Sequence, residues 1–232
     1  LRRFFVVPHH TSRTGKHGAI PYDIYPGPDA MPVIEIHSKW GTSEFRGNPT
    51  PLKNVEDGPV YTQDLLAQGY HLGFIGGTDT HAALTFAHGK GIEAGHIDRL
   101  PGLTAAQAPR LDQRHTFEAA ANRRCYAAAG ERIYLDVTVA GRAMGQEVTG
   151  TLPKQRTVRV SCAGRENIRR IDIIRNGSVV KTAKPDDWQA HITWTDKEPW
   201  DKCLMSAPER GVRFAYYYVR ATFPGNVRAW SS

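Results

Sequence analysis

Residues 73–83, GFIGGTDTHAA, contain the pattern that decides the predicted fold. Their apolar start predicts a buried strand, and the glycines that follow permit a tight turn. Asp79 and His81 come directly after, so a carboxylate and an imidazole are expected together at the end of a strand. Both groups are ligands of divalent ions such as Mn, Fe and Zn. A second interpretation is structural: Asp79 would cap a helix beginning near Ala82, and His81 would be exposed.

Two histidines follow an apolar run near the start of the sequence. Residues 2–8 end in FFVVP and predict a short strand that stops at Pro8, with His9 and His10 directly after it. Adjacent residues of a strand point to opposite faces. At most one of the two imidazoles is therefore expected to reach a given site, unless Pro8 bends the chain.

A second strand with polar side chains is expected over residues 33–38, VIEIHS. Its period-two alternation places Glu35 and His37 on one face. A helix is expected within residues 60–70, and a third strand over residues 71–75. Polar groups that finish successive strands are typical of a parallel α/β sheet or barrel, whose sites form at the carboxyl ends of the strands. A Glu and a His on the solvent face of an edge strand would give the same pattern.

From residue 131 the pattern changes to short strands of period two, such as IYLDVTV and TVRVSCA. Asn176-Gly177 between two β-rich runs is a strong hairpin signal. Before this change, a helix is expected over residues 114–129. We therefore predict an α/β plus β chain, with an α/β layer in residues 1–130 and a β-sandwich domain in residues 131–232.

Charge and histidine content separate nearly the same two parts. Residues 1–128 carry 13 Lys and Arg against 12 Asp and Glu, whereas residues 129–232 carry 17 against 11, which gives net charges of +1 and +6. Nine of the ten histidines lie in the first part. Because histidine is the commonest metal ligand and a frequent proton carrier near neutral pH, the chemistry is expected there.

Several classes of protein are disfavoured by the sequence. No stretch is apolar over the roughly 18 to 20 residues that span a bilayer, so a soluble protein of the cytoplasm or periplasm is expected. Cys125, Cys162 and Cys203 form no CxxC and are expected to be buried thiols. Basic residues of the second part alternate with apolar ones, as on a solvated sheet face, and no nucleic-acid motif is present. Neither a membrane nor a nucleic acid is an expected partner.

Longer stretches of the chain resemble one known family. VPHHTS, VIEIHSKWGTSE, GFIGGTDTHAA and FEAAANRRCYAAAGERIYLDVTVAGRAMGQEV are similar, in this order, to the C-terminal part of the DUF3604 proteins, members of the PHP (polymerase and histidinol phosphatase) metallohydrolase superfamily. The resemblance covers nearly the whole chain. It implies a distorted βα barrel that holds two or three divalent ions, of Mn, Zn or Fe, and hydrolyses phosphoesters. A full barrel needs about 250 residues, so the first part is expected to be its C-terminal half.

The resemblance also implies roles for individual residues. The metal ligands map onto Asp79 and His81, and onto His9 or His10. Five residues match a further family motif: Glu35, His37, Ser38, Ser43 and Glu44. The residues expected to act in catalysis are Asp79, His81 and Glu35, and those expected to contact a small phosphorylated substrate are His37, Ser38, Lys39 and Arg46.

We therefore expect a metal-dependent hydrolase, most simply a phosphoesterase, in which a bound divalent ion activates a water molecule for attack on an ester. The alternative is a non-catalytic scaffold or partner-binding fragment that lacks the N-terminal half of its barrel. Under this alternative a complementary N-terminal chain is the expected partner, and the chain by itself has no activity.

Overall fold

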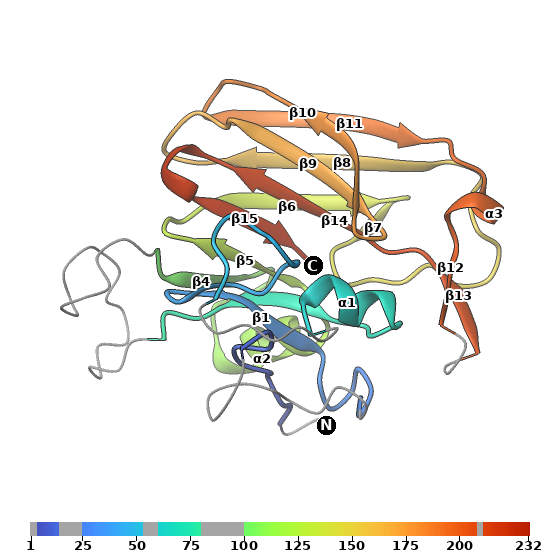
Figure 1. Ribbon diagram of the computed structural model, residues 1–232, viewed down its shortest axis with the longest axis horizontal. Helices are drawn as coiled ribbons and strands as arrows, with labels where there is room; N and C mark the ends of the chain where they lie inside the picture. The colour runs from blue at the N-terminus through green and yellow to red at the C-terminus, as the bar shows by residue number, and fades with distance from the viewer. Residues whose placement is uncertain (1–3, 14–24, 53–59, 80–99, 208–210) are drawn as a thin grey trace.

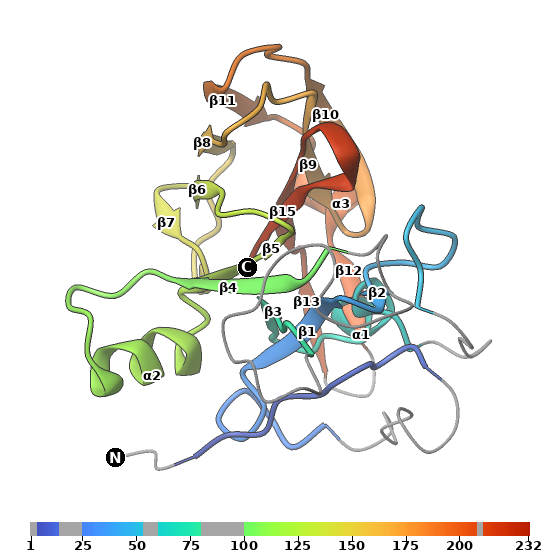
Figure 2. The ribbon, with the colours of Figure 1, turned by 90° about the vertical axis from the view of Figure 1, so that its left-hand side faces the viewer.

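Three layers are stacked in the computed structural model, which describes residues 4–13, 25–52, 60–79, 100–207 and 211–232 (Figures 1 and 2). A six-stranded sheet forms the middle layer, and a four-stranded sheet covers one of its faces. The other face is covered by β1 (Val33–Ser38), β3 (Gly73–Gly76) and α1 (Thr62–Ala67). The described chain is therefore rich in β-structure.

The middle sheet is antiparallel throughout, with strand order β10-β9-β14-β15-β5-β4. Its strands are β4 Gly102–Ala106, β5 Cys125–Ala129, β9 Arg170–Arg175, β10 Ser178–Ala183, β14 Tyr217–Thr222 and β15 Arg228–Ser231. Asn176 and Gly177 form the turn between β9 and β10, with φ of 52° and 77°. A type I′ turn requires such left-handed values, so the hairpin predicted from these two residues is confirmed.

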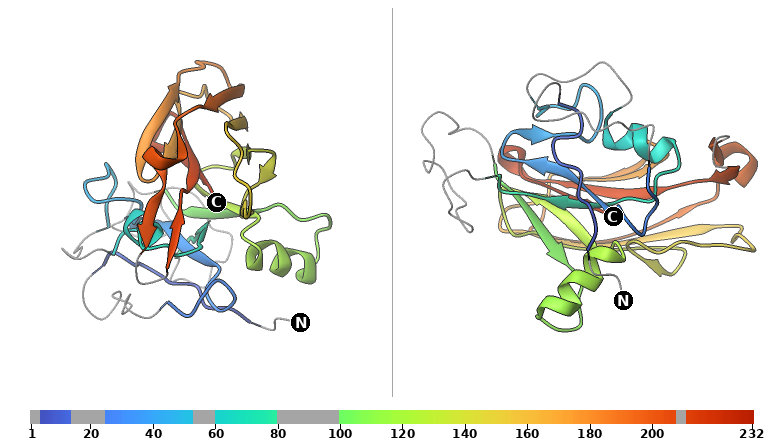
Figure 3. Two further views of the ribbon diagram at one scale, coloured as in Figure 1. Left: turned by 90° about the vertical axis from the view of Figure 1, so that its right-hand side faces the viewer. Right: turned by 90° about the horizontal axis from the view of Figure 1, so that it is seen from below.

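The second sheet has strand order β11-β8-β6-β7. Its strands are β6 Tyr134–Val139, β7 Arg142–Ala143, β8 Arg156–Ala163 and β11 Gln189–Asp196. Buried side chains alternate along β8, as expected for a strand with one face on a core. They pack against the middle sheet in a single apolar cluster, so the two sheets face each other as in a β-sandwich (Figure 3).

Smaller elements complete the described chain. They are β2 Gly41–Thr42, α2 Gln113–Ala121, α3 Trp200–Cys203, β12 Met205–Ala207, β13 Val212–Phe214 and the 3₁₀ turn Pro224–Asn226. None of the helices in the described ranges combines the length and apolar character that crossing a bilayer requires.

The end of α2 differs from the sequence prediction of a helix over residues 114–129. Arg123 has φ of 59°, its backbone N–H donates to Ala120 O (2.9 Å), and that of Arg124 donates to Ala119 O (2.8 Å). This pair of bonds is a Schellman motif, which satisfies the last helical carbonyls and ends the helix at Ala121. The prediction of helix beyond Ala121 is therefore wrong.

The residues after this turn form β5, CYAAA, in the middle of the molecule. All five are buried, with Tyr126 and Ala128 on the core shared with the four-stranded sheet and Ala127 and Ala129 on the opposite core. Alanine favours helix as an isolated residue. Here the small side chains let two layers approach one central strand, and this tertiary requirement overrides the local preference.

β1 and β3 form a parallel pair, as predicted, with Val33 opposite Gly73. Their carboxyl ends therefore lie at the same edge. The strand predicted over residues 2–8 does not form within residues 4–8. This segment instead runs beside β1 with isolated hydrogen bonds, from Val6 N to Ala30 O and from Glu35 N to Pro8 O. Pro8 has no N–H with which to continue a ladder.

The predicted domain boundary at residue 130 lies at the end of β5, within the middle sheet. Ala129 pairs with Gly102 on one side and with Arg228 on the other, so strands from both parts of the sequence share one sheet. Within the described ranges β1 and β3 are the parallel pair, the other paired strands are antiparallel, and no barrel closes.

Candidate metal-binding site

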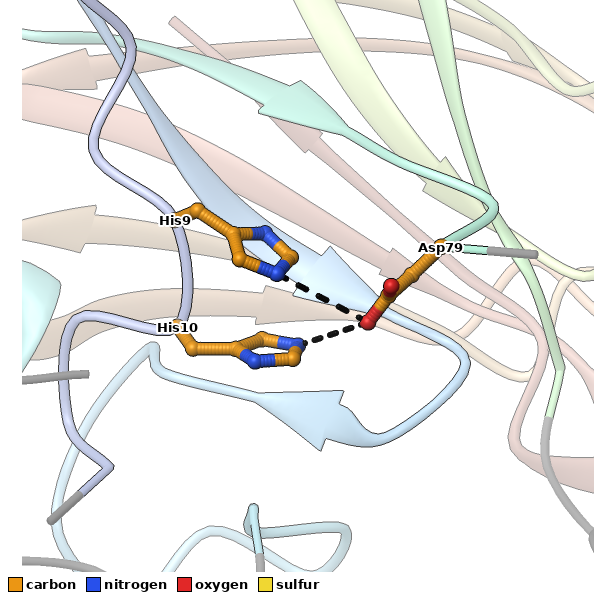
Figure 4. A group of neighbouring side chains, drawn as sticks. All are labelled: His9, His10 and Asp79. Carbon is orange, nitrogen blue, oxygen red and sulfur yellow. Dashed lines mark ion pairs between the residues drawn. The ribbon is translucent and has the colours of Figure 1, made fainter. Parts of the chain in front are cut away.

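Three side chains converge beyond the carboxyl ends of β1 and β3 (Figure 4). Oδ2 of Asp79 lies 2.9 Å from Nε2 of His10 and 3.7 Å from Nε2 of His9. The three candidate ligand atoms all lie within 4.8 Å of one another. The side chains of His10 and Asp79 are 4% and 9% exposed, whereas that of His9 is 48% exposed. The group is thus buried on one side and open to solvent on the other.

The backbone at His10 explains how two adjacent histidines reach one site. His10 has φ of 51°, in the left-handed region, which turns the chain between the two side chains. The imidazole rings consequently stack, with centroids 3.7 Å apart and planes inclined by 26°. The expectation that only one ring could reach a site assumed a regular strand. It does not hold, because the chain leaves the extended conformation at His10.

Asp79 reaches the site from the turn after β3. Gly77 N donates to His37 O (3.0 Å), which fixes this turn to the end of β1. Asp79 then adopts φ of 49°, a left-handed conformation that Asp tolerates better than most residues. His81, predicted to be a further ligand from the same motif, lies outside the described residues, and its role stays a prediction.

Glu35 supports His9 from behind. Its Oε1 lies 2.8 Å from Nδ1 of His9, where a carboxylate can only accept, so in the neutral imidazole Nδ1 carries the proton and Nε2 keeps its lone pair. This hydrogen bond raises the pKa of His9, against the opposing effect of burial; the charges of Glu35 and Asp79 raise it further, and Arg13 lowers it. A Cβ on Gly77 would overlap Oε2 of Glu35, so the space for the carboxylate exists because residue 77 is a glycine.

Ser38 lies against the same cluster, with Oγ 3.0 Å from Nε2 of His10. A nucleophilic triad would need Asp79 on the opposite nitrogen, Nδ1, in order to orient the imidazole as a base. Here the hydroxyl and the carboxylate both approach Nε2, and Nδ1 has no hydrogen-bond partner among the residues described. The geometry therefore does not favour a Ser-His-Asp nucleophile.

His37 is directed away from this cluster. A register shift between Glu35 and His37 interrupts the alternation of β1, so the two side chains do not share one face as their spacing predicts. Nε2 of His37 lies 2.9 Å from Leu100 O, and its ring stacks on Trp230 at a centroid distance of 5.6 Å. Its buried position favours a structural role over contact with substrate.

The two basic residues predicted to bind substrate occupy different places. Nζ of Lys39 lies 5.2 Å from the centroid of the Trp40 ring, and the residue is buried. The guanidinium of Arg13 lies 5.7 Å from the same ring, so two cations flank Trp40 just after Ser38. Arg46 is exposed and lies over Tyr61, at 5.3 Å.

Glu44, another residue of the matched motif, is a structural anchor. Its Oε1 accepts hydrogen bonds from Tyr218 Oη and Arg220 Nη1, and its Oε2 accepts one from Trp230 Nε1, each 2.8 Å long. The carboxylate is fully buried and joins the loop after β2 to β14 and β15. Ser43, beside it, accepts a hydrogen bond of 3.0 Å from Ser12 Oγ.

The spacing of the three ligand atoms bears on whether the cluster fits a divalent ion. Metal–ligand bonds of about 2.0–2.2 Å place neighbouring ligand atoms roughly 3 to 3.5 Å apart. The separations of 2.9 and 3.7 Å from Asp79 bracket this range, and two imidazoles with one carboxylate suit Mn, Fe or Zn. The residues present therefore fit such an ion.

Two contributors to the site were missed in the sequence. Arg13 lies close enough to His9 to influence its pKa, and no spacing rule identifies a residue in the irregular segment after His10. The sequence identifies Gly77 only as a turn residue, because the space it leaves for Glu35 depends on the folded structure. Two sizeable cavities, of about 500 and 460 Å³, lie away from the cluster.

Comparison with known proteins identifies relatives but no activity. No family model and no solved structure matches the chain. It is 30% identical to an uncharacterized protein of Chlamydia muridarum over 212 residues, and to one of Chlamydia trachomatis serovar D over 218 residues. These matches cover 86% and 88% of this chain and 33% and 34% of the relatives. The chain therefore spans about a third of the length of the curated relatives it matches.

Proposed function

We propose that this chain contributes to a divalent-metal-dependent hydrolase of the PHP type, acting on small phosphoesters. The observation that carries the proposal is the approach of Asp79 Oδ2 to the Nε2 atoms of both His9 and His10 at the end of a parallel strand pair. This is the edge at which α/β proteins assemble their active sites.

Each residue of the cluster has a chemical role under this proposal. His9, His10 and Asp79 would hold the ion, Mn, Zn or Fe, and Glu35 would fix the tautomer of His9. A divalent ion bound there would supply Lewis acidity and lower the pKa of a bound water. His81 is proposed as a further ligand from the same motif.

The substrate class rests on charge close to the site. The cationic groups of Arg13 and Lys39 flank Trp40, directly after the strand whose Ser38 contacts His10. Cations so placed would hold the phosphate of a small phosphoester, because charge-assisted hydrogen bonds to phosphate are strong. Lys39 and Arg13 are therefore proposed as substrate contacts, and Arg46, which lies over Tyr61 instead, is a weaker candidate.

Metal content is the direct test of the proposed site. Purified chain loaded with Mn or Zn and dialysed should retain metal, as measured by mass spectrometry. Asp79→Asn should bind at least about tenfold more weakly, because even residues that only support a ligand cost 10–100-fold when replaced. The matched control is Asp112→Asn, which alters a surface His–Asp pair of 2.7 Å with His115. Equal metal content in wild type and Asp79→Asn would overturn the proposed site.

Turnover is a separate measurement. Phosphomonoesters and phosphodiesters should be hydrolysed by the Mn-loaded chain, and hydrolysis should be lost in Asp79→Asn and kept in Asp112→Asn. Metal binding without turnover would overturn the catalytic part of the proposal for this chain alone.

A second candidate function is partner binding without catalysis. It is favoured by the observation that the described residues supply three converging ligands, fewer than a two- or three-metal centre uses. Under this reading, activity would appear only when a chain carrying the N-terminal half of a PHP-type barrel is added. Activity of the chain by itself would exclude this reading.

A further inference from the structure

A polar cavity of about 500 Å³ lies beside the end of α2, apart from the histidine cluster. Three arginines line it, Arg123, Arg124 and Arg142, together with the acids Asp29 and Glu147. They come from the turn after α2, from β7 and its following loop, and from the loop before β1. Figure 2 shows α2 and β7 on the same side of the molecule.

Arg123, one of the three arginines, has a structural role. Arg123 donates from Nε and Nη2 to Gly145 O, at 3.2 and 3.0 Å, and from Nη2 to Glu147 Oε1 at 2.7 Å. Glu147 also lies 2.7 Å from Nδ1 of His71. Arg123 and Glu147 therefore balance each other's charge and form one wall of the cavity.

The other two arginines are not held by hydrogen bonds in this way, although the charges of Arg124 and Glu118 act on each other. Within the described parts of the chain, neither Arg124 nor Arg142 has a side-chain hydrogen bond or ion pair, and Nε of Arg124 is buried without an acceptor. A buried donor without an acceptor lowers stability unless a ligand or water supplies one. Two guanidinium groups at one cavity, neither hydrogen-bonded to a carboxylate of the described residues, attract an anion.

The end of α2 does not oppose an anion as strongly as a bare helix terminus would. Helix C-termini carry partial negative charge on carbonyls that lack a partner. Here the carbonyls of Ala119 and Ala120 accept hydrogen bonds from the backbone of Arg124 and Arg123. The cavity therefore faces arginine side chains close to a capped helix end.

We infer that this cavity binds a small molecule bearing a phosphate or carboxylate group, held between Arg124 and Arg142. A volume of about 500 Å³ is within the range of about 300–1,000 Å³ typical of small-molecule sites. The planar forks of the two guanidinium groups match the oxygens of either anion. This site is independent of the proposed metal centre.

Isothermal titration calorimetry with the full chain tests this inference, using inorganic phosphate and succinate as separate probes at low salt, after the protein has been stripped of metal with EDTA and the EDTA removed by dialysis. At least one probe should bind saturably at one site. Arg124→Gln and Arg142→Gln should each weaken that binding by about tenfold or more. The control is Arg159→Gln, which removes an exposed arginine of β8 outside the cavity and should change affinity less than twofold. The tighter probe identifies which anion the cavity prefers.

Arg124→Lys is a second variant that separates a loss of binding from a loss of fold. It keeps the charge but removes the Nε donor, so it should bind more weakly than wild type while its circular dichroism is unchanged. The inference is overturned if neither probe binds saturably, or if Arg159→Gln weakens binding as much as Arg124→Gln.

Discussion

Nε2 of His10 lies 2.9 Å from Oδ2 of Asp79, and both residues hold a left-handed backbone, with φ of 51° and 49°. A left-handed non-glycine residue costs roughly 1 kcal/mol or more. The contact between the two side chains therefore forms at a place where the backbone is strained on both sides. Such strain persists when the surrounding structure fixes it, and it is frequent at functional sites.

The strain at His10 predicts an unusual order of stability. Both His10→Gly and His10→Ala lose the imidazole, but glycine adopts the left-handed conformation without strain. We expect His10→Gly to be more stable to urea by about 1 kcal/mol. His9, which lacks a positive φ, is the control: there the Gly variant should be less stable than the Ala variant. The same order at both positions would contradict the backbone assignment.

Glu35 and Gly77 should act on metal affinity through His9. Glu35→Gln removes the charged acceptor of the His9 Nδ1 proton, and Gly77→Ala introduces a Cβ that overlaps the carboxylate. Each variant should weaken Mn or Zn binding by about 10–100-fold in calorimetric titrations. Glu147→Gln is the control. It alters the His71–Glu147 pair, whose atoms are 2.7 Å apart and which lies outside the site, so metal affinity should be unchanged. Unchanged affinity in both Glu35→Gln and Gly77→Ala would argue against a supporting role for Glu35.

Glu44 should be required for stability rather than for metal binding. Glu44→Gln leaves Nη1 of the buried Arg220 without its carboxylate partner. We therefore expect a loss of about 3 kcal/mol in the free energy of unfolding. Tyr218→Phe removes one hydrogen bond to the same carboxylate and should cost about 1 kcal/mol. Chemical denaturation measures both losses. If Glu44→Gln were as stable as wild type but bound metal weakly, Glu44 would belong to the site.

Stability should also fall in acid through Asp196. Burial opposes ionisation of this carboxyl, but hydrogen bonds from Glu198 N, Tyr217 and Arg175, with the charge of Arg156, outweigh burial and lower its pKa. The pKa of Asp196 is lower in the folded protein than in the unfolded chain, where it is 3.8. The ionised carboxyl therefore contributes its full stabilisation above pH 3.8, and this contribution disappears as the pH falls through the pKa of the folded protein.

Unfolding measured from pH 7 to pH 2 tests this dependence. The free energy of unfolding of Asp196→Asn should be about 3 kcal/mol below that of wild type at pH 7. This difference between the two proteins should become smaller below pH 3.8. Asp201→Asn, at an exposed position, should show no such gap. A gap that is constant across this range would contradict the lowered pKa.

Local patterns predicted the elements whose partners are near in sequence. Asn176-Gly177 specified its hairpin because the turn requires positive φ at both residues. VIEIHS predicted β1, and the polar groups at strand ends identified the edge at which His9, His10 and Asp79 meet. These features follow from backbone conformation and strand alternation, which few residues determine.

Features set by distant contacts could not be predicted in the same way. The sequence CYAAA predicts helix because alanine favours helix. Its strand conformation instead depends on pairing with β4 and β15. Likewise, Glu44 could be matched only to a family motif, and its anchoring role depends on Tyr218, Arg220 and Trp230, which come from the end of the chain. The joint approach of His9 and His10 depends on one positive φ, which no residue pattern at these positions requires.

The middle sheet, in which β5 is hydrogen-bonded to β15 and β4, has a consequence for how the chain comes apart. Breaking these hydrogen bonds would expose both apolar clusters to water at once, because β5 contributes side chains to each. The amide protons of Ala127 and Ala128 should consequently exchange with deuterated solvent as slowly as those of β14, through global opening alone. Cutting the chain after residue 130 would then yield two pieces that each lose a cooperative partner, rather than two self-sufficient modules.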